Sequence, residues 1–201
     1  MPDLRRHQRH PEDPDRARIV NIRQAGAADL PPFFVYLDDH LRDNGRDGAP
    51  LFQPPPLPAM RAQSQLPPGL KVAFIEGLAI PVGEPGWRRL WLALDARGSI
   101  AGHIDLRARP EPLARHRAML GMGVHRAYRR RGLGMRLVDT AIDWARSQDG
   151  LRWIDLEVLS ENRPAVALYL RSGFAMTARV EDMLEIDGVS QDLSYMTCAL
   201  R

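Results

Sequence analysis

Apolar residues recur along the chain with two spacings, and these spacings predict the order of strands and helices. Short segments with alternating or continuous apolar residues predict strands over residues 19–25, 87–94, 99–107, 119–124, 153–159, 174–186 and 189–200. Segments in which apolar residues return after three or four positions predict helices from Asp29 to Asn44, from Leu70 to Ile80, from Leu133 to Gly150 and from Asn162 to Gly173.

Polar residues and prolines mark the ends of several of these elements. Asp29 and Asn162 are expected to cap the helices that follow them, and each of these helices has proline in its first turn. Asp187-Gly188 lies between the last two strands and is typical of a tight hairpin turn.

This order of elements predicts an α/β fold with a mixed sheet. Antiparallel strands come first, a strand–helix–strand–helix section follows, and a hairpin closes the chain. In such a sheet, a ligand is expected where parallel strands end and their helices begin.

Two segments do not fit this pattern. Residues 1–18 are charged and poor in apolar residues, so we expect a disordered basic leader ahead of one domain over residues 19–201. Residues 47–68 are rich in proline, which excludes regular helix and central strand. A loop of this kind is either a lid or substrate wall or an inert surface insertion.

Composition limits the classes of function. The 201 residues are 44% hydrophobic, carry a formal net charge of +3 and include one cysteine, Cys198. A charge this small does not predict a protein that coats nucleic acid, and a single cysteine excludes an internal disulfide. No apolar run has the ~20 residues of a membrane helix, and no His, Asp and Cys grouping has metal-ligand spacing. We therefore expect a cytoplasmic protein without a metal site.

The segment from Val124 to Leu137 carries the strongest chemical pattern. Arginines and two glycines, Gly132 and Gly134, separate an apolar strand from a helix, an order that offers backbone N–H groups and a helix dipole to a phosphate. A P-loop would need Lys and Ser or Thr after the second glycine, and the dinucleotide fingerprint would need a third glycine. Positive charge opposes the dipole at a helix start, so an anion site is favoured over a solvated arginine cluster.

Two motifs together resemble the GNAT superfamily of acyl-CoA-dependent N-acyltransferases. The first is Arg129-x-x-Gly132-x-Gly134, and the second is Asn162-x-x-Ala165-x-x-Leu168-Tyr169-x-x-x-Gly173-Phe174. The resemblance implies a mostly antiparallel twisted sheet of six to seven strands with helices on both faces. It also implies that coenzyme A (CoA) binds at splayed central strands.

The resemblance further implies a set of contacts to acetyl-CoA. The main chain of the strand would hold the pantetheine arm, the basic turn would wrap the pyrophosphate, and the helix cap would touch the cofactor. The residues concerned are Met122, Gly123, Val124, Arg129, Arg130, Arg131, Gly132, Leu133, Gly134, Met135 and Asn162. Gly121 and Gly123 also weaken their strand and favour a bulge or splay, unless they serve only loose helix packing.

Acid–base roles are expected for two residues. Tyr169 would protonate the departing thiolate, a step about 2 kcal/mol uphill from the solution pKa values, unless it is an ordinary core tyrosine. Glu157 is the best base, in a layout similar to ribosomal-protein alanine N-acetyltransferases. Asp155 lies on the same strand face at ~7 Å, so one of the two carboxyls is expected to have a raised pKa. The alternatives are two solvated acids, or a base that acts through water.

The acceptor amine stays open between a small molecule and a protein or peptide N-terminus. Asp38, Asp39 and Asp43 are candidates to attract a cationic amine, and His103 and His125 are secondary candidates for the acceptor cleft and a phosphate. The expected partners are acetyl-CoA and an amine acceptor, without nucleic acid or membrane, and a homodimer is left open. The rival interpretations are a non-catalytic CoA-binding sensor or interaction module, and nucleic-acid binding by the arginines.

Overall fold

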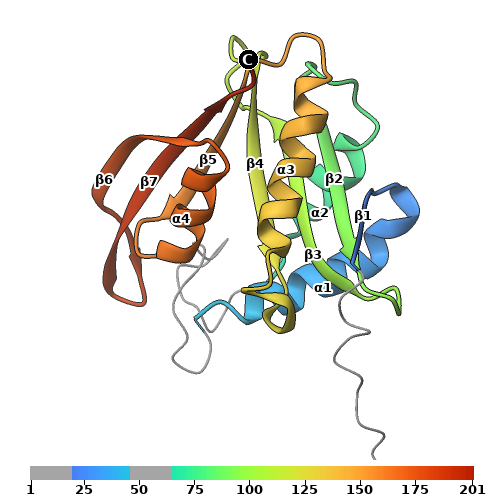
Figure 1. The fold of residues 1–201 in the computed structure, drawn as a ribbon, viewed down its shortest axis with the longest axis horizontal. Coiled ribbons are helices and arrows are strands. Elements are labelled where there is room, and N and C mark those ends of the chain that lie inside the picture. Colours follow the sequence, from blue (N-terminus) through green and yellow to red (C-terminus); the bar gives the residue numbers. More distant parts are fainter. Residues whose placement is uncertain (1–19, 46–64) are drawn as a thin grey trace, which may run out of the picture.

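The computed structural model describes residues 20–45 and 65–201, in which helices cover both faces of a seven-stranded sheet (Figure 1). The strands are β1 (Asn21–Gln24), β2 (Arg88–Leu94), β3 (Ile100–Ala108), β4 (Arg117–Val124), β5 (Trp153–Leu159), β6 (Ala175–Ile186) and β7 (Val189–Ala199). The helices are α1 (Leu30–Arg42), α2 (Pro68–Gly77), α3 (Leu133–Arg146) and α4 (Arg163–Arg171). Short 3₁₀ turns precede α1 (Ala27–Asp29) and α3 (Arg126–Tyr128).

The strand order is β1-β2-β3-β4-β5-β7-β6, and only the β4–β5 pair in this sheet is parallel. The mixed, mostly antiparallel sheet expected from the sequence is therefore confirmed. The β6–β7 turn forms as expected, because Asp187 and Gly188 both have positive φ (52° and 73°), the conformation that a tight hairpin turn requires.

Two apolar cores lie on opposite faces of the sheet. Helix α3 covers one face with a buried stripe at three- and four-residue spacing, formed by Leu133, Leu137, Val138, Ala141, Ile142 and Ala145. Helices α1 and α2 cover the other face, where Phe33 and Phe74 pack near Leu90 and Leu92 of β2. Alternate residues of each central strand therefore face different layers.

Strands β4 and β5 pair over only three positions and then diverge. Arg117, Ala118 and Met119 pair with Trp153, Ile154 and Asp155, and the pairing ends there. Beyond this point β4 stays paired to β3, and β5 stays paired to β7. The sheet therefore opens as a wedge between the C-terminal halves of β4 and β5, which Figure 1 shows beside α3 and α4.

The closed end of this wedge is held by the carboxylate of Asp155 on β5. It accepts hydrogen bonds from Arg117 Nε of β4 at 2.7 Å, from Arg109 Nη1 at 2.8 Å and from Thr197 Oγ1 of β7 at 2.8 Å. The Asp155 side chain is 10% exposed, so these bonds satisfy a carboxylate that water hardly reaches. One buried charge thus joins the two halves of the sheet.

Several local expectations were wrong. Asp29 does not cap α1, because its carboxylate accepts hydrogen bonds from the Gly26 N–H at 2.9 Å and from Arg23. Strand β4 begins at Arg117 rather than Met119, since polar residues at its start still form ladder pairs. The expected leader and most of the proline-rich loop lie outside the described residues. Within the described part, no helix is long and apolar enough to cross a membrane.

Replacing Asp155 with alanine is expected to destabilise the fold, because it leaves Arg117 without its carboxylate and Arg109 with only Glu111 as an acidic partner. Both arginine side chains are about a quarter exposed, so the loss of unfolding free energy should be about 2–3 kcal/mol, below the 3–5 kcal/mol of a fully buried pair. Urea unfolding measures it. The control Asp143→Ala removes an exposed pair with Arg146 and should cost under about 1 kcal/mol. Equal losses in the two variants would contradict this role of Asp155.

Candidate active site

The open half of β4 presents unpaired main-chain groups to the wedge. His125 N donates to Ala101 O at 3.0 Å, and the ladder alternates, so odd-numbered residues bond β3 while Met122 and Val124 are turned toward β5. The Val124 carbonyl is taken by Arg129 Nε at 3.0 Å. In the described part of the chain no strand pairs with the remaining outward groups, which include the N–H groups of Met122 and Val124. An extended ligand can bind there as an added strand.

The basic turn that follows β4 has the backbone of an anion cradle. Arg130 has φ 59° and Gly132, the N-cap of α3, has φ 79°, both in the left-handed region. Such residues at a helix start turn successive N–H groups toward one point, where the helix dipole adds positive potential. Arg130, Arg131 and Gly132 are exposed, whereas Leu133 is buried and anchors the helix.

Gly134 lets α3 approach α4 at the mouth of the wedge. A Cβ at this position would lie 2.6 Å from Leu168 Cδ1 of α4 and 3.5 Å from Met122 Cε of β4. The next residue adds a second contact, because Met135 Sδ accepts a hydrogen bond from Ser172 Oγ at 3.1 Å. The two sequence motifs, thirty residues apart in the chain, are therefore neighbours in the structure.

The aspartates of α1 do not form a free acidic surface. Asp39 pairs with Arg126 at 2.7 Å, Asp43 pairs with Arg129 at 2.6 Å, and Asp38 pairs with Arg42 of its own helix. The expectation that these carboxylates attract a cationic amine was therefore wrong, because arginines neutralise them. The same pairs tie the basic turn to α1.

Asn162 and Tyr169 belong to the fourth helix. The Asn162 Oδ1 accepts from Ala165 N at 3.3 Å, so the expected cap of α4 is confirmed. Tyr169 is 7% exposed and packs on Phe174, with ring centroids 5.6 Å apart. Burial raises the pKa of Tyr169 above its usual value of 10, so its proton is retained at neutral pH. Donation to a thiolate is then further uphill than the solution values give.

Asp155 and Glu157 differ in environment although they share a strand face. Burial raises the pKa of Asp155, but hydrogen bonds from Arg117, Thr197 and Arg109 outweigh it and leave this pKa below the usual value. The expected raised pKa is therefore absent at Asp155, which is a structural anion. Glu157 is exposed, opposite Tyr195 of β7, and makes no ion pair with another described residue.

A buried cluster of Tyr36, His40 and His103, here called the imidazole–phenol cluster, packs under β4 at Gly123. The Tyr36 hydroxyl lies 3.3 Å from Gly123 O and 3.3 Å from His103 Nδ1, and the rings of Tyr36 and His40 stack at 5.9 Å. His103, one of the candidates from the sequence, is therefore part of this cluster next to Gly123 of β4. His125 accepts Ala127 N–H and lies 3.9 Å from Asp39.

Sequence reasoning missed Tyr36 and His40 as parts of the site. The pattern of α1 contained a clue, because both polar rings fall on the stripe that holds Phe33, Leu37 and Leu41. A tyrosine and a histidine four residues apart on a buried helix face need polar partners. The identity of those partners depends on the tertiary fold.

Comparison with known protein families agrees with this geometry. The family model described as the Acetyltransferase (GNAT) family matches residues 64–174, more than half of the chain. The chain belongs to the GNAT acetyltransferase family. This assigns it to the acyl-CoA-dependent N-acetyltransferases, as the two motifs predicted.

Individual relatives agree with that assignment. The L-amino acid N-acetyltransferase AaaT of Escherichia coli (strain K12) is 26% identical over 113 residues, which cover 56% of this chain and 68% of AaaT. The GNAT-family acetyltransferase from Streptococcus pneumoniae has a TM-score of 0.73 at 24% identity, covering 90% and 99% of the two chains. The structure of yncA from Salmonella typhimurium, with its cofactor acetyl-CoA, has a TM-score of 0.70 at 20% identity, covering 91% and 95%. The two structural likenesses show the GNAT fold.

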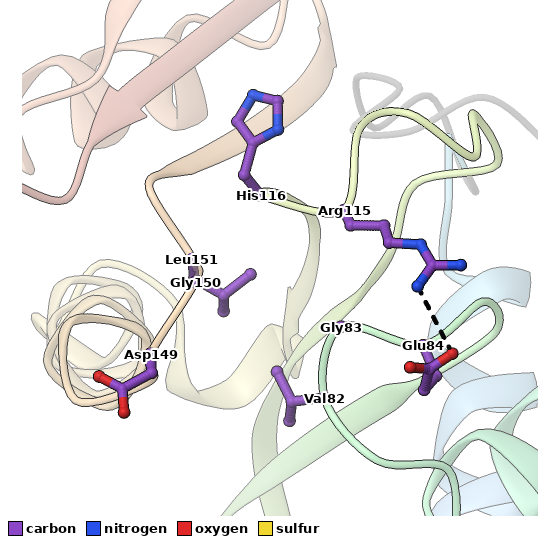
Figure 2. Close-up of a pocket in the computed structure, with 8 residues that line it drawn as sticks. All are labelled: Val82, Gly83, Glu84, Arg115, His116, Asp149, Gly150 and Leu151. Atoms are coloured by element: carbon purple, nitrogen blue, oxygen red, sulfur yellow. Dashed lines mark ion pairs between the residues drawn. The ribbon is translucent and has the colours of Figure 1, made fainter.

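A separate hollow lies at the opposite end of β4 and is not part of this site. Its volume is about 330 Å³, and Figure 2 shows its lining from the loop after α2, the residues before β4 and the turn before β5. Arg115 and Glu84 face each other there at 3.7 Å, but both side chains are more than half exposed. No group of His, Cys, Asp and Glu in residues 20–45 and 65–201 is placed to hold a metal ion.

The two buried histidines of this GNAT protein predict a loss of stability in mild acid. Burial lowers the pKa of both His40 and His103 to about 3, with a further contribution from neighbouring positive charge. Unfolded histidine binds a proton near pH 6.5, whereas the native residues stay neutral until about pH 3. Unfolding free energy therefore falls as pH drops from 6.5, by about 2 kcal/mol per histidine at pH 5.

Urea unfolding between pH 7 and 5 measures this slope, in a range above the usual pKa of carboxyl groups. His103→Asn should reduce the slope by about one proton, whatever its effect on stability at pH 7. The control is His116→Asn, which makes the same substitution at a histidine outside the buried cluster. An unaltered slope in His103→Asn would contradict the assignment.

Proposed function

We propose that this GNAT enzyme transfers an acetyl group from acetyl-CoA to the primary amine of a small amino acid-like molecule, by direct attack in a ternary complex. One observation carries the proposal: the outward main chain of β4 at Met122 and Val124 opens beside the left-handed basic turn. An extended acyl-pantetheine arm and a pyrophosphate need these two features side by side. When bound, acetyl-CoA supplies an activated thioester carbonyl and a thiol leaving group.

The cofactor contacts proposed here divide by type of group. Outward main-chain groups of Met122 and Val124 hold the arm, and the N–H groups of the turn from Arg130 to Met135 hold the pyrophosphate. The expected main-chain contact from Gly123 is not part of this proposal, because its N–H and carbonyl are turned toward β3. Arg130 and Arg131 supply charge to the anion, while Arg129 keeps the turn in place through Asp43 and Val124 O. Asn162 caps the start of α4, the helix that packs against Gly134 through Leu168, and contacts the cofactor in this proposal.

Two side chains carry the proton transfers in this proposal. Glu157 is exposed on β5 and accepts the proton of the attacking amine, directly or through water. Tyr169 keeps its phenolic proton because burial raises its pKa, and it donates this proton to the departing thiolate. No covalent acyl-enzyme is needed, since Cys198 is buried in the closing strand β7.

The acceptor class rests on the AaaT relative rather than on the charge of the sheet face below α1 and α2. Four arginines lie there, at positions 88, 107, 109 and 117. Glu157 joins the carboxylates of Asp105, Asp155 and Glu111 on this face, so the two signs balance. The name of AaaT, an L-amino acid N-acetyltransferase, favours an acceptor that carries a carboxylate over a polycation.

Tyr169→Phe is expected to lower kcat about 10- to 100-fold, because the thiolate then leaves without a proton donor, while CoA affinity stays the same. Thiol release from acetyl-CoA measures the rate, with L-amino acids, spermidine and a peptide bearing a free N-terminus as acceptors. L-Amino acids should stimulate release most.

Tyr128→Phe is the matched control, since its hydroxyl bonds Asp95 on the β2–β3 hairpin at 2.7 Å. If no amine stimulates thiol release from a protein that binds CoA, a CoA-binding sensor replaces the enzyme proposed here. If spermidine or the peptide is preferred, the acceptor class is wrong.

Gly134→Asp is expected to weaken CoA binding by tenfold or more, because a carboxylate at the first turn of α3 repels the pyrophosphate and the new Cβ crowds Leu168. Isothermal titration with CoA measures the affinity. Gly69→Asp is the control, because it adds the same charge where a Cβ has nothing within 4 Å. Thermal melting of both variants separates lost binding from lost folding. Unchanged CoA affinity in a folded Gly134→Asp protein would place the pyrophosphate elsewhere.

A further inference from the structure

The peptide unit between Gly123 and Val124 faces two parts of the molecule at once. Its carbonyl points toward β3 and lies 3.3 Å from the Tyr36 hydroxyl of α1. Its N–H, which belongs to Val124, points the other way, into the wedge where β4 and β5 no longer pair. Because both groups belong to one conjugated amide, a hydrogen bond accepted by the carbonyl strengthens the N–H as a donor.

The direction of the hydrogen bonds in the imidazole–phenol cluster follows from the chemistry of its members. Gly123 O can only accept, so the single proton of the Tyr36 hydroxyl goes to this carbonyl. The Tyr36 oxygen must then accept from His103 Nδ1, also at 3.3 Å. His103 is therefore the tautomer that carries hydrogen on Nδ1. The resulting chain runs from His103 through Tyr36 to the Gly123–Val124 peptide.

Burial keeps this chain in one protonation state. Tyr36 is 8% exposed and His103 is 5% exposed. Burial raises the pKa of Tyr36 above its usual value and lowers the pKa of His103 to about 3. At neutral pH the phenol therefore keeps the proton that it donates, and the imidazole is neutral.

The cluster also packs directly on the β4 main chain. A Cβ at position 123 would lie 2.5 Å from His40 Nε2 and 2.7 Å from His103 Cε1. Only glycine lets these rings approach so closely, and Phe33 closes the other side at 5.2 Å from the His103 ring. Tyr36 is thus held against one carbonyl by packing as well as by hydrogen bonds, which favours a defined orientation.

We propose that Tyr36 is a positioning residue for acyl-CoA: its hydroxyl, oriented by His103, polarises the Gly123–Val124 peptide and aims the Val124 amide at a carbonyl oxygen of the acyl-pantetheine arm. The inference rests on the proposed function, which places that arm along Met122–Val124. This carbonyl oxygen belongs either to an amide of the arm or to the thioester. Both groups are uncharged and can accept one N–H hydrogen bond. Helix α1, on the acceptor side of the sheet, thereby acts on the cofactor side through one peptide unit.

The test follows the Val124 amide by NMR in ¹⁵N-valine-labelled protein. In the absence of cofactor, Tyr36→Phe should move the Val124 ¹H and ¹⁵N signals upfield, because the Gly123 carbonyl loses the Tyr36 donor and keeps only its ladder partner on β3. The same variant should bind CoA about two- to fivefold more weakly, within the net worth of one hydrogen bond. It should also melt at a lower temperature, because the buried His103 Nδ1–H loses its acceptor, so spectra and binding are measured well below the melting temperature of the variant. Tyr128→Phe, whose hydroxyl bonds Asp95 instead of β4, should leave the Val124 signals in place.

Titration of the wild type with CoA and with acetyl-CoA separates the two carbonyls. A Val124 amide that shifts equally with both ligands assigns it to an amide of the arm, and one that shifts only with acetyl-CoA assigns it to the thioester. Both results support the proposal. Unchanged Val124 signals in Tyr36→Phe would overturn it while leaving the proposed function intact. A wild-type Val124 amide that responds to neither ligand, although CoA binds, would overturn the arm placement and this use of Tyr36 together.

Discussion

The structure depends on the place where β4 and β5 stop pairing. Three ladder positions join the strands, and after Met119 and Asp155 no strand pairs with β4 on that side within the described residues. An open ladder in the middle of a sheet would be costly if it were dry and unused. Here the buried carboxylate of Asp155 fixes the closed end, and the opposite end leaves outward groups of β4 without a strand partner among the described residues.

The wedge has a different chemistry on each face of the sheet. The α3–α4 face combines a left-handed turn, a helix N-terminus and the close approach of Gly134 to Leu168, all of which suit a long anionic cofactor. The α1–α2 face has the buried Arg88, paired aspartates and the imidazole–phenol cluster. Transfer between two substrates requires both faces to meet at one strand. The two faces meet at strand β4, because its even-numbered residues point to the α3–α4 face and its glycines to the α1–α2 face.

Local patterns in the sequence predicted the local structure of the basic turn and of α4 well. The positive φ of Gly132, the cap at Asn162 and the helix with Tyr169 depend on residues a few positions apart, so their spacing already contains the geometry. The α1–α2 face depends on pairs distant in the chain. Asp155 meets Arg117 and Arg109 only after the sheet forms. The prediction of a raised pKa for a carboxyl on this strand was wrong at Asp155. The spacing of residues along the sequence does not reveal the arginines that pair with it in the folded sheet.

Ion pairs between α1 and the basic turn reduce the number of arginines in the turn that carry unpaired positive charge. Arg126 and Arg129 are neutralised by Asp39 and Asp43, and Arg136 donates to Val20 O at 2.8 Å. Arg130 and Arg131 therefore remain as exposed charges of this turn, on a backbone that the other arginines hold in shape. Residues 43 and 129 form one ion pair, so substitutions at these two positions are expected to be non-additive. An acidic residue on one helix thus helps to fix the shape of a basic turn some eighty positions later.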